Sequence, residues 1–136
     1  MDIQGGCLCG EVRFKSDAQP LFMGKCYCTD CQKETGAGHM TGAAVPIASL
    51  TVTGSVKRFA KKGGSGQDVV RIFCTNCGTT LIGEPAILPG IAMVRASLLD
   101  DASGIAPATA IFTRSAQPWD QPPAGMVSFP GAPPAP

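Results

Sequence analysis

The stretch "RIFCTNCGTTL", residues 71–81, carries two cysteines three positions apart, directly after a run of β-prone residues. Cys74 and Cys77 form a zinc-knuckle pattern, in which two thiolates point at one ion. Gly78 follows them, and glycine lets the backbone take the tight turn that this pattern needs. A closed structural zinc site has four protein ligands, so this pair predicts a second pair elsewhere in the chain.

The matching pair lies near the start of the chain, in "GGCLCGEV" at residues 5–12. If this segment is extended, Cys7 and Cys9 point to the same side, and the flanking glycines relieve crowding around the ion. Structural zinc contributes on the order of 10 kcal/mol or more to folding. The spacing therefore predicts a site that decides whether the domain folds, with the ligands Cys7, Cys9, Cys74 and Cys77.

A third cluster, "KCYCTDCQK" at residues 25–33, contains three cysteines and no fourth. Thr29 and Gln32 fit a capping box, which predicts a short helix near residues 30–35. A helix N-terminus, a bound metal and nearby lysines all lower the pKa of thiols. Three protein ligands and one exchangeable position are typical of a catalytic zinc. We therefore predict a second zinc, with catalytic sulfurs, at Cys26, Cys28 and Cys31.

The sequence leaves open two alternatives to a zinc ion with a free fourth position. A protein side chain could close the fourth position and make the site structural, and the candidates are His39, Asp30 and Glu34. His39, the single histidine, could equally be a solvated loop residue without a role. An iron–sulfur cluster fits less well, because its usual spacings place two residues between successive cysteines, and here the first gap is one residue.

Composition and charge narrow the class of protein. Eleven Lys and Arg against ten Asp and Glu give a net charge of +1, without the basic block of a nucleic-acid-binding protein. The sequence shows no signal-peptide pattern and no run near the roughly 20 apolar residues of a membrane span. We expect a cytoplasmic protein with no nucleic-acid or membrane partner. Its seven cysteines are an odd number in a reducing compartment, which favours metal ligation over disulfides.

The rest of the chain predicts a mainly β scaffold. Only 6% of residues are aromatic, and 17 glycines and 12 prolines favour short strands joined by turns in small twisted sheets. Beyond Ala116, seven prolines argue against regular structure, and Trp119 and Phe129 are expected to pin this part to the body. We predict one zinc-binding domain over residues 1–131 and a flexible proline-rich tail over residues 132–136.

The cysteine blocks, in their order and surroundings, resemble a known family. "GGCLCGEVRF", "CYCTDCQKETGA" and "GSGQDVVRIFCTNCGTTL", followed by "SLLDD", "AIFTRSAQPW" and "FPG", are similar to the glutathione-dependent formaldehyde-activating enzyme and centromere protein V family. The similarity runs from about residue 4 to residue 131. It implies a β-tent fold of small antiparallel sheets, a structural zinc on the first and last cysteine pairs, and a second zinc on the middle three cysteines.

The resemblance also implies an activity, the formation of S-(hydroxymethyl)glutathione from formaldehyde and glutathione. We therefore expect a zinc-dependent enzyme of carbon–sulfur lyase type that acts on glutathione or a small thiol adduct. The alternative is a non-catalytic module with two structural zincs, used for thiol carriage or protein interaction. Tyr27 and Ala110 stand where the family usually has histidine, and neither position is a zinc ligand in the family pattern.

A glutathione ligand would require cations or N–H donors for its two carboxylates. An open zinc on three thiolates carries a net negative charge and keeps a bound sulfur nucleophilic, which suits carbonyl or alkyl transfer to sulfur. The candidate cations are Lys25, Lys33 and Arg71, with Arg58 as a further possibility. The loop "KKGGSGQD", residues 61–68, offers flexible N–H donors at Gly63, Gly64 and Gly66.

Overall fold

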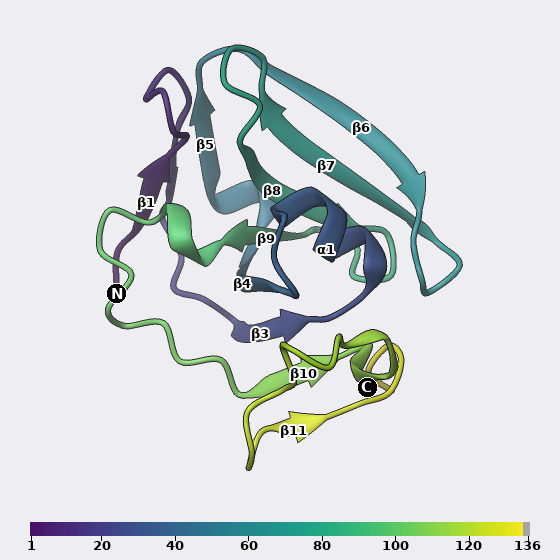
Figure 1. The fold of residues 1–136 in the computed structure, drawn as a ribbon. Coiled ribbons are helices and arrows are strands. Elements are labelled where there is room, and N and C mark those ends of the chain that lie inside the picture. Colours follow the sequence, from purple (N-terminus) through teal and green to yellow (C-terminus); the bar gives the residue numbers. More distant parts are fainter. Residues whose placement is uncertain (135–136) are drawn as a thin grey trace.

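The computed structural model describes residues 1–134, and over this range the protein is mainly β, as the sequence predicts (Figure 1). Its α-helix, α1 (Thr29–Thr35), covers the stretch predicted to be helical. The strands in chain order are β1 (Ile3–Gly6), β2 (Arg13–Ser16), β3 (Phe22–Cys26), β4 (Met40–Pro46), β5 (Leu50–Thr53), β6 (Val56–Lys62), β7 (Asp68–Cys74), β8 (Thr80–Pro85), β9 (Ile91–Arg95), β10 (Thr109–Ile111) and β11 (Val127–Ser128). Short 3-10 turns are η1 (Ile47–Ser49), η2 (Ala96–Leu98) and η3 (Thr113–Ser115). Within residues 1–134, no helix has the length and apolar character needed to cross a bilayer.

In the part of the chain that the structure describes, the strands form two sheets. Three of them make a small antiparallel sheet in the order β1-β2-β5, and the other eight follow the order β11-β10-β3-β4-β9-β8-β7-β6. All pairing is antiparallel except at β10, which runs parallel to both β3 and β11. The predicted antiparallel sheets are therefore confirmed, with β10 as the exception. Figure 1 shows the long β6–β7 hairpin extending from the body, with α1 between it and β3.

The structure gathers the seven cysteines into two groups, and these belong to two separate apolar clusters. The larger core contains Cys7 and Cys74 among its buried residues, so the four-cysteine site lies at the edge of the main core. The other members of this core are Ile3, Val12, Phe14, Ala43, Val45, Ile72, Leu81, Ile82, Ala92, Val94 and Leu99. The smaller cluster consists of Cys26, Cys31, Met40 and Phe112, with Cys28, Ile111 and Ala132 packed against it.

The proline-rich C-terminal part is more regular than predicted. The expectation of no regular structure beyond Ala116 is wrong at β11, where no proline occurs and the N–H of Val127 donates to Ala108 O at 3.2 Å. Trp119 does not pin this segment, because its side chain is 71% exposed, whereas Phe129 is half-buried. The domain boundary at residue 131 and the flexible tail stay predictions, and residues 135–136 of that tail lie outside the described residues.

Gly5 determines how closely β1 approaches the turn after β9. A Cβ atom at this position would lie 2.0 Å from Leu98 O and 2.9 Å from Leu99 Cα, both backbone atoms that cannot move aside alone. Gly5→Ala is therefore expected to lower the free energy of unfolding by about 3 kcal/mol, the upper end of the usual cost of overpacking. Urea unfolding measures the change, with Gln4→Ala on the exposed face of β1 as control. Equal midpoints for the two variants would contradict this account.

Candidate functional site

The first cysteine site brings together a segment near the start of the chain and the turn after β7. The sulfurs of Cys7, Cys9, Cys74 and Cys77 all lie within 4.8 Å of one another, with 3.5 Å from Cys7 to Cys9 and 3.8 Å from Cys9 to Cys74. A zinc ion with four sulfurs at about 2.3 Å needs sulfurs about 3.8 Å apart. The donor set and its spacing therefore fit one zinc ion with all four positions filled by the protein.

The second half of this site is a tight turn after β7. The N–H groups of Asn76 and Cys77 point at the Cys74 sulfur, at 3.4 Å and 3.5 Å, and Gly78 has the positive φ of 78° that the turn requires. The hydroxyl and N–H of Thr79 donate to Cys77 and lower its pKa to about 5. Sulfurs that accept several N–H and O–H groups are stabilised as thiolates, the form that binds metal.

The first half of the site differs from the prediction in its backbone. Cys7 and Cys9 do not lie on an extended segment; they belong to a turn after β1, in which the N–H of Gly10 donates to Cys7 O at 3.1 Å. Gly10 has a φ of 81°, so glycine is suited to close this turn. The N–H of Val12 then donates to the Cys7 sulfur at 3.2 Å. The two sulfurs converge because the chain folds back, not because strand side chains alternate.

The second cysteine site lies where β3 passes into α1. The sulfurs of Cys26, Cys28 and Cys31 lie within 4.8 Å of one another, and Cys26 and Cys31 are buried while Cys28 is half-buried. The predicted cap at Thr29 is wrong: Cys28 is the N-cap, and its sulfur accepts the N–H of Cys31 at 3.3 Å. A sulfur therefore fills the position usually held by a hydroxyl or carboxylate oxygen, which places a potential metal ligand at the start of the helix.

The three thiols differ in their affinity for protons. Hydrogen bonds from the Cys26 and Cys31 thiols and from the Cys31 N–H, together with the charge of Arg71, lower the pKa of Cys28. The same hydrogen bonds hold protons on the two donors, so the pKa of Cys26 is raised to about 12 and that of Cys31 is raised further by burial. Without metal, the site therefore consists of one thiolate with two thiol donors.

Zinc binding at these three cysteines is expected to become tighter as the pH rises. Because the pKa of Cys26 and of Cys31 is raised, both are protonated near neutral pH, and the metal must displace both protons. The apparent association constant should thus increase about a hundredfold per pH unit between about pH 6 and pH 8. Competition with a chelator, corrected for the chelator's own protonation, measures this slope. An affinity independent of pH would contradict the assignment of two displaced protons.

The side chains proposed as a fourth ligand all have other partners. Asp30 pairs with Lys61 at 3.0 Å, and Glu34 pairs with two arginines. Both ring nitrogens of His39 are engaged, Nδ1 with Asp120 Oδ2 at 2.6 Å and Nε2 with Lys25 Nζ at 3.2 Å. Among residues 1–134, the groups of potential metal ligands at this position contain only the three cysteines. This arrangement favours an open fourth position over a closed one.

The four candidate cations lie in different places, and Arg71 pairs with Glu34, which follows Cys31 by three positions on α1. Lys25 points to His39, on the opposite side of β3 from Cys26, and Lys33 is exposed in the last turn of α1. Arg58 pairs with Glu84 on β8. The loop with Gly63 and Gly64 forms the tip of the β6–β7 hairpin, where Gly64 packs against the ring of Phe112.

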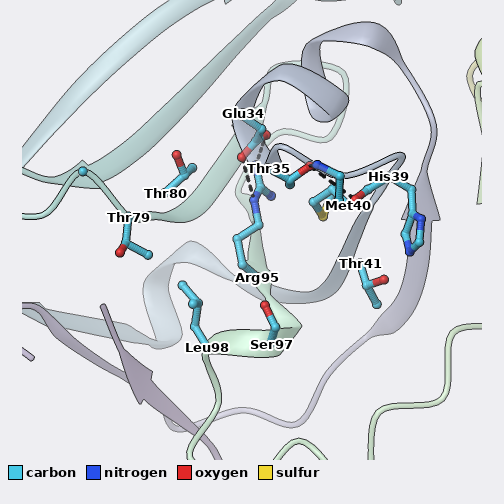
Figure 2. A pocket seen from close by; sticks show the side chains of 12 residues that line it. Glu34, Thr35, His39, Met40, Thr41, Thr79, Thr80, Arg95, Ser97 and Leu98 are labelled. Atoms are coloured by element: carbon cyan, nitrogen blue, oxygen red, sulfur yellow. Dashed lines mark hydrogen bonds and ion pairs between the residues drawn. The ribbon is translucent and has the colours of Figure 1, made fainter. Parts of the chain in front are cut away.

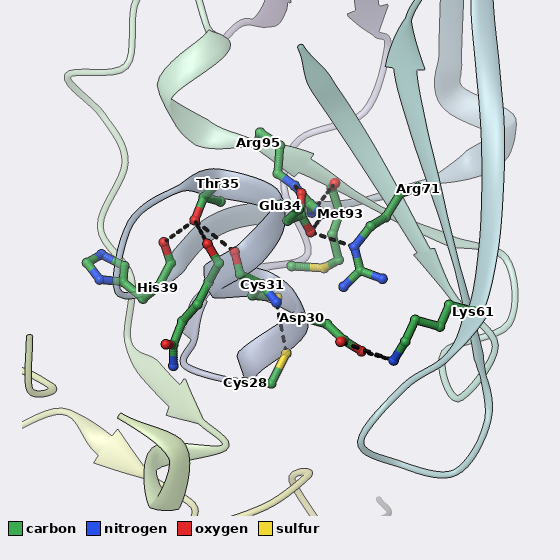
Figure 3. A network of polar contacts seen from close by, with 11 residues as sticks. Cys28, Asp30, Cys31, Glu34, Thr35, His39, Lys61, Arg71, Met93 and Arg95 are labelled. Atoms are coloured by element: carbon green, nitrogen blue, oxygen red, sulfur yellow. Dashed lines mark hydrogen bonds and ion pairs between the residues drawn. The ribbon is translucent and has the colours of Figure 1, made fainter. Parts of the chain in front are cut away.

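Glu34, Arg71 and Arg95 form a cluster of three buried charges (Figure 3). The sequence did not predict this cluster. Glu34 accepts hydrogen bonds from Arg71 Nε at 2.8 Å and from Arg95 Nη2 at 2.5 Å. The side chains of Glu34, Arg71 and Arg95 are only 7%, 11% and 7% exposed. Two signals were available: Glu34 follows Cys31 by three positions and shares its helix face, and Arg95 is a charge within the apolar run "IAMVRAS".

A pocket of about 460 Å³ with a mixed polar and apolar lining adjoins this charge cluster (Figure 2). Glu34 and Arg95 line it, together with the hydroxyl groups of Thr35, Thr41, Thr79, Thr80 and Ser97. Thr35 Oγ1 donates to Cys31 O at 2.7 Å, and Thr79 contacts Cys77, so the pocket adjoins both cysteine sites.

Comparison with known proteins identifies a family and two relatives. The family model described as glutathione-dependent formaldehyde-activating enzyme matches residues 2–115. A protein of Schizosaccharomyces pombe named as an uncharacterized lyase is 29% identical over 80 residues, 59% of this chain and 56% of that protein. A Halomonas elongata protein, provisionally named a glutathione-dependent formaldehyde-activating enzyme, is 32% identical over 89 residues, 60% of this chain and 55% of that protein. The matches thus span about half the length of each relative.

A solved structure shares the fold. The crystal structure of a Rhodobacter sphaeroides protein superimposes with a TM-score of 0.57 at 21% sequence identity, covering 77% of this chain and 92% of that one. At this identity the likeness concerns the arrangement of the strands and the helix alone. It confirms that the two sheets and α1 form a known architecture.

Proposed function

Because this chain belongs to the glutathione-dependent formaldehyde-activating enzyme family, we propose that it is an enzyme of carbon–sulfur lyase type acting on glutathione or a small thiol adduct. We propose Cys26, Cys28 and Cys31 as the reacting centre. The observation that carries the proposal is a three-sulfur site whose neighbouring acids and histidine are all engaged elsewhere. Such a site would leave the fourth coordination position of a metal ion to a sulfur from outside the protein.

The cysteine sites fit zinc by their donor chemistry. We propose two ions per chain, a structural one on Cys7, Cys9, Cys74 and Cys77 and a second on the three remaining cysteines. A zinc ion at the second site would supply Lewis acidity that favours the thiolate form of a bound thiol at neutral pH. Tight packing of Phe112 and Met40 against Cys26 and Cys31 keeps water away from that side of the site.

The reaction that suits this site is the addition of a thiol to an aldehyde. The sulfur forms a bond to the carbonyl carbon, the carbon–oxygen π pair moves to oxygen, and the proton released by the thiol ends on that oxygen. Formaldehyde and glutathione then give S-(hydroxymethyl)glutathione, and the reverse reaction breaks the same carbon–sulfur bond. Arg71 supplies a positive charge beside the sulfurs, and we propose it, with Lys25 and Lys33 further out, for the carboxylates of glutathione.

Titration of the zinc-loaded protein with glutathione and several thiol adducts tests this proposal. With cobalt at the three-cysteine site, a fourth sulfur is expected to change the visible absorption spectrum. Exchange of ¹³C-formaldehyde with its glutathione adduct, followed by NMR, should be faster with protein than without it. Unchanged spectra and unchanged exchange would overturn the enzyme and favour a non-catalytic module with two structural zincs. A spectrum that changes without faster exchange would overturn catalysis and favour thiol carriage.

A further inference from the structure

The side chain of Gln32 connects three separate segments of the chain. Its Nε2 atom donates to Tyr27 O and to Ser115 O, both at 2.9 Å, and its Oε1 atom accepts from Gln117 Nε2 at 3.0 Å. A side-chain amide nitrogen carries two hydrogens, and both are used here. Because carbonyl oxygens accept and do not donate, the two carbonyl partners require the nitrogen side of the amide and fix its orientation.

These bonds hold the backbone that carries two of the three cysteines in the second site. Tyr27 stands between Cys26 and Cys28. Its carbonyl accepts from Gln32 on α1, and its N–H donates to a carbonyl of β10 at 3.0 Å. The N–H of Gln32 also donates to Cys28 O at 3.0 Å. Because Gln32 directly follows Cys31, it ties the backbone of the first two cysteines to the helix that carries the third.

The other partners of Gln32 belong to residues 113–120, which we name the η3 segment. This segment has a second attachment, because Asp120 Oδ2 lies 2.6 Å from His39 Nδ1 in the connection between α1 and β4. Gly38 leaves the space for this pair, since a Cβ atom there would lie 2.3 Å from Asp120 Oδ2. The η3 segment is therefore held at two points, and Gln32 is the one that neighbours a cysteine in the sequence.

We propose that Gln32 is a positioning residue for the three-cysteine site, which sets the spacing of the sulfurs before a metal binds and couples the metal affinity of the site to the η3 segment. This inference rests on the proposed function, because it requires that the three cysteines bind a metal ion. Gln32 acts through the backbone, since its side chain bonds to two carbonyl groups and to an amide.

A site with three protein ligands depends on how well its scaffold holds them. Side chains and backbone that are ordered only when the ion binds cost conformational entropy, and a scaffold that already fixes them avoids this cost. Outer partners that orient metal ligands typically contribute about 10- to 100-fold to metal affinity. Since Gln32 acts through the peptide groups between two ligands, we expect an effect at the lower end, about tenfold.

Cobalt affinity measures the positioning without any thiol or aldehyde substrate. Full-length protein that holds one zinc ion per chain is titrated with Co²⁺ against a competing chelator, and the Cys28→Ser variant identifies the absorption that belongs to the three-cysteine site. Gln32→Leu removes both donors but keeps a good helix former, and it should lower the cobalt association constant about tenfold. Gln67→Leu, at an exposed position before β7, is the matched control and should leave the constant unchanged.

The zinc affinity of the four-sulfur site separates positioning from general destabilisation. Gln32→Leu should leave this affinity unchanged. Equal losses at both sites would overturn the positioning role, and so would equal cobalt affinities of Gln32→Leu and the wild type. A wild-type protein that binds no metal at the three cysteines would overturn the proposed function as well, whereas binding that does not depend on Gln32 would overturn this inference alone.

The coupling to the η3 segment is tested by combining substitutions. Asp120→Ala removes the second attachment of the segment and should lower the cobalt affinity by less than Gln32→Leu does. Because the segment acts on the site through Gln32, the double variant should match Gln32→Leu. An Asp120→Ala variant with wild-type affinity would overturn the coupling, and independent, multiplicative effects would do the same.

Hydrogen exchange of the wild type tests the coupling without a variant. Coupling is reciprocal, so a segment that strengthens metal binding must itself be stabilised when the metal binds. The amides of Ala116 and Asp120 donate within the η3 segment at 3.1 Å and 3.0 Å, and their exchange should slow severalfold when zinc fills the three-cysteine site. Unchanged exchange would overturn the coupling, and this measurement stays available if Gln32→Leu does not fold.

Discussion

Replacing Cys74 with serine is expected to unfold the domain. Cys74 is 1% exposed, belongs to the main core and shares a four-sulfur site with Cys7, Cys9 and Cys77. Structural zinc contributes on the order of 10 kcal/mol or more to folding, whereas a whole domain is stable by only about 5–15 kcal/mol. Loss of one zinc ligand is therefore expected to remove most of the free energy of unfolding of the domain. Far-UV circular dichroism, thermal unfolding and zinc content per chain measure the effect.

The matched comparison is a serine at the other cysteine site. Cys28→Ser removes a ligand of the same type from the smaller cluster, where Cys28 is half-buried and packs at the edge. We expect this variant to keep the strand spectrum and a cooperative transition while it binds one zinc instead of two. A cooperatively folded Cys74→Ser protein would contradict the structural role of the four-sulfur site.

Replacing Cys28 with alanine is expected to lower thiol-dependent activity by about a hundredfold or more, with the fold intact. In the proposed function three cysteines hold a catalytic zinc, and removal of one would weaken the site on which thiol binding would depend. The same variant also loses the N-cap sulfur of α1, a contribution of about 1 kcal/mol to helix stability. Glutathione binding, formaldehyde exchange and thermal unfolding of the same sample separate the two effects.

Thr29→Ala is the control for this variant. Thr29 neighbours Cys28, is exposed and was predicted to cap the helix, but the structure assigns the cap to Cys28. Thr29→Ala should therefore leave activity and stability close to those of the wild type. If Cys28→Ala unfolds the protein as Cys74→Ser does, the second site is structural as well, and the non-catalytic module becomes the better hypothesis.

The amino-acid sequence by itself determined the division of the cysteines and the family. A few residues of backbone separate Cys74 from Cys77, and the same holds for the three cysteines from Cys26 to Cys31. Such spacing can be recognised in the sequence without knowledge of the fold. The helix after Cys28 and the short strands follow from local preferences in the same way. For this reason the mainly β fold and the family were predicted correctly, while local details such as the N-cap and the turn at Cys9 were not.

Only the tertiary structure decided which charges meet at the second site. Glu34 lies 37 positions from Arg71 and 61 from Arg95, and His39 lies 81 from Asp120. No local rule ranks such pairs, because their energy depends on burial and on geometry that several strands set together. The same holds for β10, whose parallel pairing with β3 depends on the path of a long connection. Short stretches of sequence thus bring the sulfurs close together. Glu34, Arg71 and Arg95 meet only once β7 and β9 pack against α1.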